Sequence, residues 1–258
     1  PTVGVEQIDP FLLVDEMGPI TYAPGEAVGA PDHPHRGFET VTYVLQGEAQ
    51  HEDSAGHRGT IGPGDVQWMT AGGGIVHSEE PSDAMKRDGG TMHGFQLWVN
   101  LPKRDKLMPP RYQEVKAAQL PKATTADGLA KVTVIAGEAL GATARIETRT
   151  PIIYQHWVLE PGARVEQPVD AAMQGFAYVF KGTALVAGRE VKDGQLALFS
   201  SGDSIELAAT ERAELLLLAG QPLNEPLARY GPFVMNTEDE LVQAVRDFQA
   251  GRLGQIAR

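Results

Sequence analysis

The stretch PDHPHRGFETVTYVLQG, residues 31–47, carries the pattern from which both the fold and the site can be argued. Its second half is rich in Val, Thr and Tyr and ends at a glycine, which is typical of a β-strand followed by a turn. His33 and His35 lie two residues apart at its start, and side chains at i and i+2 of a strand point to one face. We therefore expect this spacing to aim two imidazole rings at a common point.

A second pair of polar side chains with the same spacing occurs in GGGIVHSEE, residues 72–80. If this stretch is extended, His77 and Glu79 also share a face, and two antiparallel strands could gather them with His33 and His35. Three imidazoles and one carboxylate suit Fe, Mn, Co, Ni, Cu or Zn, whereas Ca and Mg prefer all-oxygen shells. The alternative is that these residues are loop or surface histidines that bond to backbone carbonyls or to water.

The remaining histidines are interpreted first as structural. His51 and His57 flank HEDSAGH, which resembles a solvated hairpin tip. His93 opens a predicted strand, where a supporting role next to the site is the alternative, and His156 is expected to be structural. Glu39 shares the strand parity of His35 unless Gly37 forms a bulge, so it is either a further ligand or a base near the site.

Composition excludes several classes of protein. The chain has 258 residues, a net charge of −12 and a pI of about 5.0, which argues against binding to nucleic acid through phosphate contacts. It has no cysteine, so disulfides and thiolate metal sites are excluded. No 18-residue apolar run and no signal-peptide pattern are found, so we expect a cytoplasmic protein without a membrane segment.

Short apolar stretches bounded by glycine or proline recur about every ten residues, which favours an all-β sandwich or barrel. The one clear helix is expected in NTEDELVQAVRDFQAG, where Thr237 and Glu240 form a capping box and Gly251 can end the helix. The segment 103–128 breaks the rhythm and is interpreted as a linker, with a short helix near QEVKAA. The other predicted strands are ETVTYVLQG, TIGPGDVQWMTAGGG, HGFQLWVNLP, KVTVIAG, IIYQHWVLEPG, FAYVFKG, QLALFSSGD and ELLLLAG.

The chain also repeats itself weakly. TYVLQG (42–47) resembles AYVFKG (177–182), and GPGDVQWMTAGGGIV (62–76) resembles KDGQLALFSSGDSIE (192–206). We therefore predict two copies of one β-fold, in domains 1–128 and 129–258. Carried through the repeat, the four candidate ligands fall on Pro168, Asp170, Leu207 and Ala209. The second copy thus lacks the set of three histidines and a glutamate, so the site is expected only in the first copy.

The motif residues resemble those of the cupins. His33, His35 and Glu39, followed by Gly47, by Pro63-x-Asp65 and by His77, match the cupin pattern. The strings PDHPHRGFETVTYVLQG, HEDSAGHRGTIGPGDVQWMTAGGGIVHSE, HGFQLWVNLP and GPFVMNTEDELVQAVRDFQAGRLG resemble the pirin family in particular.

The resemblance implies an all-β bicupin, with two tandem jelly-roll-like barrels and a short C-terminal helix. It implies one metal in the N-terminal barrel, most simply Fe with Mn, Co, Ni, Cu and Zn as alternatives, held by His33, His35, His77 and Glu79. Glu39 stays outside the ligand set, because the first-motif glutamate is usually not a ligand in pirins.

Two functions follow from the resemblance. The first is a quercetin 2,3-dioxygenase-type activity, in which O2 opens the ring of a flavonol and CO is released. Glu79 would act as the general base, and Phe38, Trp68 and Met69 are candidates for the apolar lining. The second is an iron-binding redox sensor that docks a protein partner without turnover and without direct contact to nucleic acid.

Overall fold

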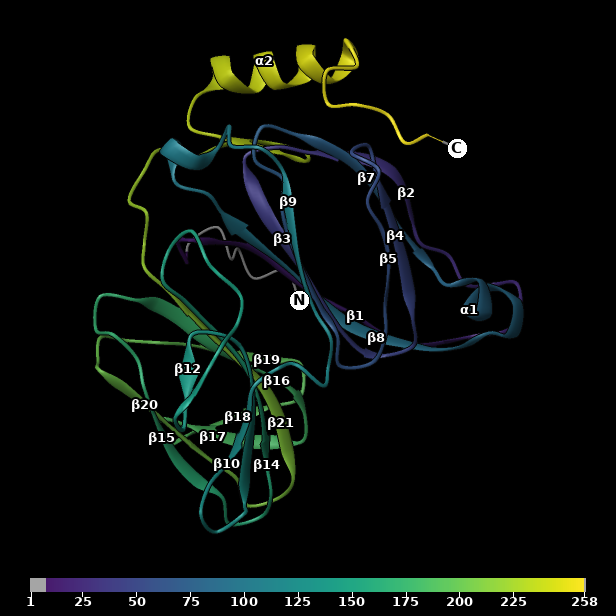
Figure 1. The fold of residues 1–258 in the computed structure, drawn as a ribbon. Coiled ribbons are helices and arrows are strands. Elements are labelled where there is room, and N and C mark those ends of the chain that lie inside the picture. Colours follow the sequence, from purple (N-terminus) through teal and green to yellow (C-terminus); the bar gives the residue numbers. More distant parts are fainter. Residues whose placement is uncertain (1–7, 258) are drawn as a thin grey trace. The chain divides into compact units, whose positions relative to one another are not determined.

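The structure, a computed structural model, describes residues 8–257 and divides them into two compact units (Figure 1). One unit contains residues 11–117 and 224–257, and the other contains residues 8–10 and 118–223. Each unit is built around a β-barrel of two facing sheets, which confirms the predicted all-β fold with two copies. None of the helices in the described part of the chain is long and apolar enough to cross a membrane.

The first barrel packs a five-stranded sheet, in the order β1-β8-β3-β6-β9, with a four-stranded sheet, in the order β2-β7-β4-β5. All of these neighbouring strands are antiparallel. The elements are β1 (Phe11–Tyr22), β2 (Ala30–His35), β3 (Phe38–Gln46), β4 (Ala49–Asp53), β5 (Arg58–Ile61), β6 (Val66–Thr70), β7 (Ile75–Pro81), α1 (Asp83–Asp88), β8 (Gly90–Asn100), the 3₁₀ turn η2 (Lys103–Asp105) and β9 (Arg111–Val115).

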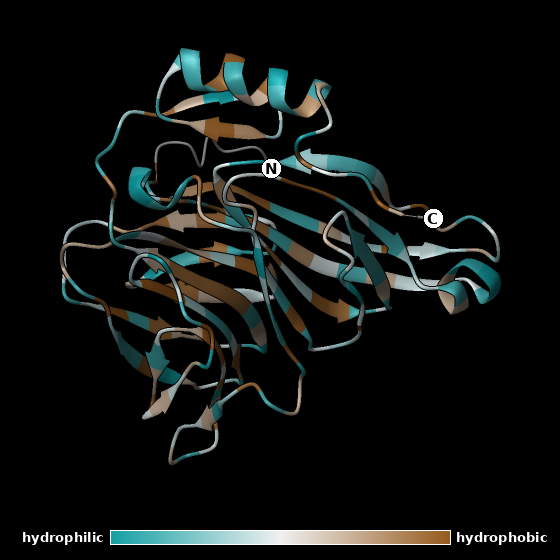
Figure 2. Cartoon of the chain, turned by 45° about the horizontal axis from the view of Figure 1, so that its top comes forward, coloured by the Kyte–Doolittle hydropathy of each residue, from teal (hydrophilic) through white to brown (hydrophobic). Residues whose placement is uncertain are grey.

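The second barrel repeats this topology. Its sheets have the orders β10-β11-β14-β21-β16-β19 and β15-β20-β17-β18, so β14 to β21 follow the same path as β1 to β8. Figure 2 shows that the strands carry both hydrophobic and hydrophilic residues. The elements are β10 (Lys122–Thr124), β11 (Ala130–Ala136), β12 (Glu138–Ala139), β13 (Ala142–Thr143), β14 (Ile152–Leu159), β15 (Arg164–Pro168), β16 (Gln174–Lys181), β17 (Thr183–Val186), β18 (Arg189–Lys192), β19 (Gln195–Leu198), β20 (Ser204–Ala208) and β21 (Ala213–Gly220).

The C-terminal segment returns to the first barrel. It contains β22 (Ala228–Tyr230), β23 (Phe233–Met235) and the helix α2 (Glu238–Gln249). The helix begins with the predicted capping box of Thr237 and Glu240, and Gly251 follows its end with φ 73°. Its apolar face packs with β22, β23 and Val76 of β7, and Arg36 forms an ion pair of 2.7 Å with Asp247.

Two expectations about the middle and the end of the chain differ from the structure. The predicted division at residue 128 assigned the last 35 residues to the second copy, whereas their contacts group residues 224–257 with the first barrel. The helix expected near QEVKAA is wrong, because part of that stretch lies in β9, which extends the first barrel, and β10 extends the second. The boundary between the two units, at residues 117 and 118, does lie within the predicted linker. Lys, Pro and Ala made this segment look irregular, and only the neighbouring strands supply its pairing partners.

Candidate metal centre

Three imidazoles gather inside the first barrel. β2 and β7 are antiparallel neighbours, and their register places His33 directly opposite His77. His35 follows at the same strand parity as His33, and the three ring centroids lie 4.3–4.9 Å apart. One nitrogen from each ring lies within 4.8 Å of the others, which is a spacing that a single metal ion can bridge. The predicted convergence of these three histidines is therefore present.

The ring nitrogens are available for a ligand. Within the part of the chain that the structure describes, neither nitrogen of buried His77 has a hydrogen-bond partner, and Nδ1 of His35 has none either. Nδ1 of His33 lies 2.7 Å from the carbonyl oxygen of Pro31, to which it can donate. That bond would leave Nε2 of His33 with its lone pair, as in metal-binding histidines whose other nitrogen is oriented by an acceptor.

Burial keeps His35 and His77 uncharged. The pKa of His77 is lowered to about 4, mainly by desolvation; the carboxylate of Glu79 opposes this shift, and nearby His33 adds to it. Desolvation, followed by the charges of His77 and His33, lowers the pKa of His35 well below its ordinary value. Because only neutral imidazole can donate a lone pair to a cation, burial keeps these two rings in the ligand form at neutral pH.

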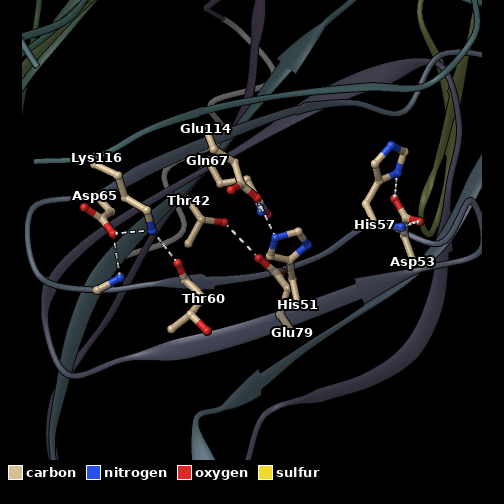
Figure 3. Close-up of polar contacts among 11 residues, drawn as sticks. Thr42, His51, Asp53, His57, Thr60, Asp65, Gln67, Glu79, Glu114 and Lys116 are labelled. Carbon is tan, nitrogen blue, oxygen red and sulfur yellow. Dashed lines mark hydrogen bonds and ion pairs between the residues drawn. The ribbon is translucent and has the colours of Figure 1, made fainter. Parts of the chain in front are cut away.

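Glu79 lies close to the three histidines but is held by other side chains. Its Oε1 accepts a hydrogen bond of 2.8 Å from the hydroxyl of Thr42 (Figure 3). Its Oε2 accepts one of 3.0 Å from Nε2 of Gln96. It is not part of the three-imidazole group, so its predicted place as the fourth ligand stays a prediction. The two hydrogen bonds fix the carboxylate on the interior face of β7, next to His77.

A second polar group inside the barrel was missed by the sequence analysis. His51 was expected in a solvated loop, but it lies in β4 directly opposite Glu79 and only 2% of its surface is exposed. Its Nε2 lies 2.6 Å from Oε1 of Glu114, which also accepts a hydrogen bond from Gln67 (Figure 3). The period-two spacing of Ala49, His51 and Asp53 was the signal that could have placed this residue in the interior.

Aromatic side chains line the other side of the three histidines. The ring of His35 lies 5.1 Å from that of Phe38 and 5.4 Å from that of Trp98, measured between centroids. Met69 lies on the interior parity of β6, because Gln67, two residues earlier, reaches Glu114. Trp68 has the opposite parity, so it is excluded from the lining. Trp98 takes its place, which the sequence analysis did not foresee.

The other candidates lie away from the three histidines. Glu39 faces opposite to Phe38 on β3, where its Oε1 accepts a hydrogen bond of 2.6 Å from Thr70. It thus lies outside the imidazole group, as the family pattern implied. His57 is half exposed and pairs with Asp53, while His93 pairs with Glu16 at 2.8 Å. His156 lies in the second barrel, 3.6 Å from a carboxylate oxygen of Glu214, in agreement with a structural role.

The strand registers correct the counterparts that the sequence repeat had indicated. The projection gave Pro168 and Asp170 for the first two histidines, but β15 buries the alternate residues, and Gln167 lies opposite Ile205 as His33 lies opposite His77. A constant offset fails because loop lengths differ between the copies. The seven interior positions correspond as follows: His33 to Gln167, His35 to Val169, His77 to Ile205, Glu79 to Leu207, Thr42 to Ala177, Gln96 to Leu217 and His51 to Val186.

Six of these seven counterparts belong to the apolar core of the second barrel, and Gln167 is the exception. Throughout residues 8–257, the three histidines of the first barrel are the only group with a spacing suited to a metal ion. Polar side chains at these positions thus distinguish the first barrel from the second.

Comparisons with known proteins agree with this architecture. The pirin family model matches residues 2–99, and the model of the pirin C-terminal cupin domain matches residues 154–254. A pirin-like protein of Solanum lycopersicum is 43% identical over 255 residues, which cover 97% of this chain and 84% of the relative. The chain belongs to the pirin family.

Solved structures give the same result for this pirin. The crystal structure of quercetin 2,3-dioxygenase from Acinetobacter baumannii superposes with a TM-score of 0.93 at 40% identity, over 98% of this chain and 88% of that one. The bacterial pirin YhhW of Escherichia coli, solved in complex with nickel(II), has a TM-score of 0.66 at 21% identity over 83% of this chain and 84% of that one. The second likeness concerns the fold alone.

Proposed function

We propose that this pirin binds one divalent transition metal in the first barrel and catalyses quercetin 2,3-dioxygenase-type ring opening of a flavonol. The observation that carries the proposal is the cluster of three buried or half-buried imidazoles whose nitrogens lie within 4.8 Å of one another. The similar structure of a protein named quercetin 2,3-dioxygenase supports the reaction class.

The donor set fits a borderline transition metal. His33, His35 and His77 would hold the ion by nitrogen, and Glu79 would complete the set by a carboxylate oxygen. Fe is the metal we propose, and Mn, Co, Ni, Cu and Zn share the same donor preferences. The unpartnered nitrogens of His77 support this assignment, because a buried imidazole without a partner is unfavourable unless a ligand satisfies it. The bound ion would act as a Lewis acid that brings a hydroxyl oxygen and O2 together.

Glu79 is the proposed general base. The 3-hydroxyl proton of the flavonol would pass to its carboxylate, which Thr42 and Gln96 hold in place from β3 and β8. Two C–C bonds of the central ring then break, both oxygen atoms enter the organic product, and the carbon that carried the 3-hydroxyl leaves as CO. Phe38 and Trp98 offer flat apolar surfaces beside His35 on which the aromatic rings of the substrate can pack.

The test is to measure O2 uptake and CO release with quercetin after loading the protein separately with Fe(II), Mn, Co, Ni or Cu. The proposal expects equal amounts of O2 consumed and CO released, with activity lost in the Glu79→Gln variant. A protein that retains metal but shows no turnover with any of these ions would contradict the enzyme and favour a redox sensor. Turnover without O2 uptake would instead indicate an isomerase-type reaction.

Composition and the proposed donor set also support proposals for the cellular location and the binding partners of the protein. A cysteine-free chain with nitrogen and oxygen ligands suits the reducing cytoplasm. The proposed substrates are a flavonol-like aromatic compound and O2. In the sensor alternative, the acidic chain would suit a basic protein partner better than nucleic acid.

A further inference from the structure

The second barrel contains a cleft that the proposed reaction does not use. Its volume is about 880 Å³, and its lining residues lie in the segments 137–153 and 167–173 and at Asp203. By strand register, two of the lining residues, Gln167 and Val169, are the counterparts of His33 and His35. In the second barrel, the cleft thus includes the positions that correspond to two of the imidazoles of the first barrel. Its volume is typical of small-molecule sites.

One wall of the cleft is apolar. Ile146 and Ile152 are buried, and Met173 is half buried at the edge of the barrel core. The hairpin of β12 and β13 contributes Ala139 and the exposed Leu140. An apolar wall of this kind favours a ligand with a hydrophobic body, because its burial removes apolar surface of both partners from water.

The charged residues of the cleft all have the same sign. Glu138, Asp170 and Asp203 line it, and no Lys, Arg or His is among its lining residues. Asp170 is fixed by its own loop, because its Oδ1 accepts a hydrogen bond of 2.9 Å from the backbone nitrogen of Ala172. The backbone nitrogen of Val169 donates to the carbonyl of Asp203, which holds the two aspartate-bearing segments side by side. These charges favour a cation and disfavour an anion.

An unsatisfied acceptor supplies an independent sign of a ligand. Gln167 is only 3% exposed, and its Nε2 donates to the carbonyl oxygens of Glu138 and Pro168. Its Oε1 has no hydrogen-bond partner among residues 8–257. A buried amide oxygen is normally paired, so this cleft-lining side chain retains an acceptor for an N–H or O–H donor.

We propose that this cleft is a second binding site, for an organic amine whose ammonium group meets Asp170 and Asp203 and whose apolar body packs on the isoleucine wall. An N–H of the ligand satisfies Oε1 of Gln167. Binding of the amine needs no metal, and no covalent bond of the amine forms or breaks there. The site is therefore independent of the histidine centre of the first barrel.

The test uses tryptamine as probe, with tryptophol and indole-3-propionate as neutral and anionic analogues of nearly the same shape. Calorimetric titration of the full chain is expected to show one bound tryptamine and about fivefold weaker binding of tryptophol, since an exposed ion pair contributes about 1 kcal/mol. Indole-3-propionate should bind more weakly still, and added salt should weaken only tryptamine. Equal binding of the three probes, or no binding of tryptamine, would overturn the proposal.

Variants locate the binding. The double change Asp170→Asn and Asp203→Asn alters exposed side chains, and it should weaken tryptamine by about fivefold and remove its advantage over tryptophol. Thr148→Trp should fill the cleft and abolish binding. Asp193→Asn, at an exposed turn outside the cleft, and His77→Ala in the first barrel should leave the tryptamine affinity unchanged. Loss of affinity in either control, or none in the double variant, would place the amine elsewhere.

Discussion

The two barrels of this pirin have the same topology and opposite interiors. In the first, β2, β4 and β7 turn histidines and a glutamate inward, and in the second the corresponding strands turn aliphatic side chains inward, with Gln167 as the one exception among the seven counterparts. The scaffold depends on strand alternation and on glycine turns, which both copies share. The difference teaches that chemistry resides in a few inward positions that the fold tolerates as either polar or apolar.

The largest effect that would test this comparison is the loss of metal from the first barrel. His77→Ala removes a proposed ligand, so metal affinity should fall by at least about a hundredfold, more than the loss of a supporting residue causes. Elemental analysis of protein purified without added metal measures this effect. His156→Ala, in the second barrel, is the matched control and should keep the metal. If the two variants lost metal equally, the assignment of the centre to the first barrel would be wrong.

Exchange of one interior residue between the barrels should have opposite effects on stability. Ile205→His places an imidazole in an apolar core and should lower the free energy of unfolding by about 2–3 kcal/mol. His77→Ile removes a buried imidazole that lacks partners, and it should leave the metal-free protein equally stable or up to about 1 kcal/mol more stable. Urea unfolding of metal-free protein would measure both. Strong destabilisation by His77→Ile would show that the first interior is not tolerant of apolar residues.

A smaller effect, on the rate of the proposed reaction, should follow from removing one of the two hydrogen bonds that hold the carboxylate of Glu79. The counterpart of Thr42 in the second barrel is Ala177, which has no hydroxyl. Thr42→Val removes the hydroxyl from the first barrel and keeps the size of the side chain. Loss of the 2.8 Å hydrogen bond should reduce kcat for flavonol oxidation by about tenfold while metal content is retained. Thr70→Val removes a comparable hydrogen bond to Glu39 on the opposite face of the sheet and should leave kcat unchanged. Equal losses in both variants would indicate a general effect on folding.

The smallest effect concerns a carboxylate of the second barrel. His156 and then Lys181 lower the pKa of Glu214 from 4.5 to about 2. Because the folded pKa is depressed, the stabilisation is present above pH 4.5 and is lost as the pH falls towards 2. Glu214→Gln should therefore cost about 1 kcal/mol at neutral pH, a value typical of a partly exposed pair, and almost nothing near pH 2. Unfolding measured across this range would contradict the assignment if the difference did not change.

Much of the fold and part of the site could be predicted from local patterns. Period-two spacing predicted that His33, His35 and His77 lie on neighbouring antiparallel strands with their rings on one face, and the capping box placed α2. The interior position of His51 and the contact of Trp98 with His35 were not predicted, because pairing between strands distant in sequence determines which residues meet. The counterparts Gln167 and Ile205 were misplaced by one or two positions for the same reason, since loop lengths alter the offset between copies.

The sequence alone determined that this chain forms two similar all-β barrels and that one of them alone carries a set of candidate metal ligands. Those properties depend on residue type and on a spacing of two, which are local. The tertiary structure decided that Thr42 and Gln96 hold Glu79, that the C-terminal helix belongs to the first barrel, and that the second barrel has a cleft next to Gln167. These properties depend on contacts between distant segments, which arise only when the sheets close.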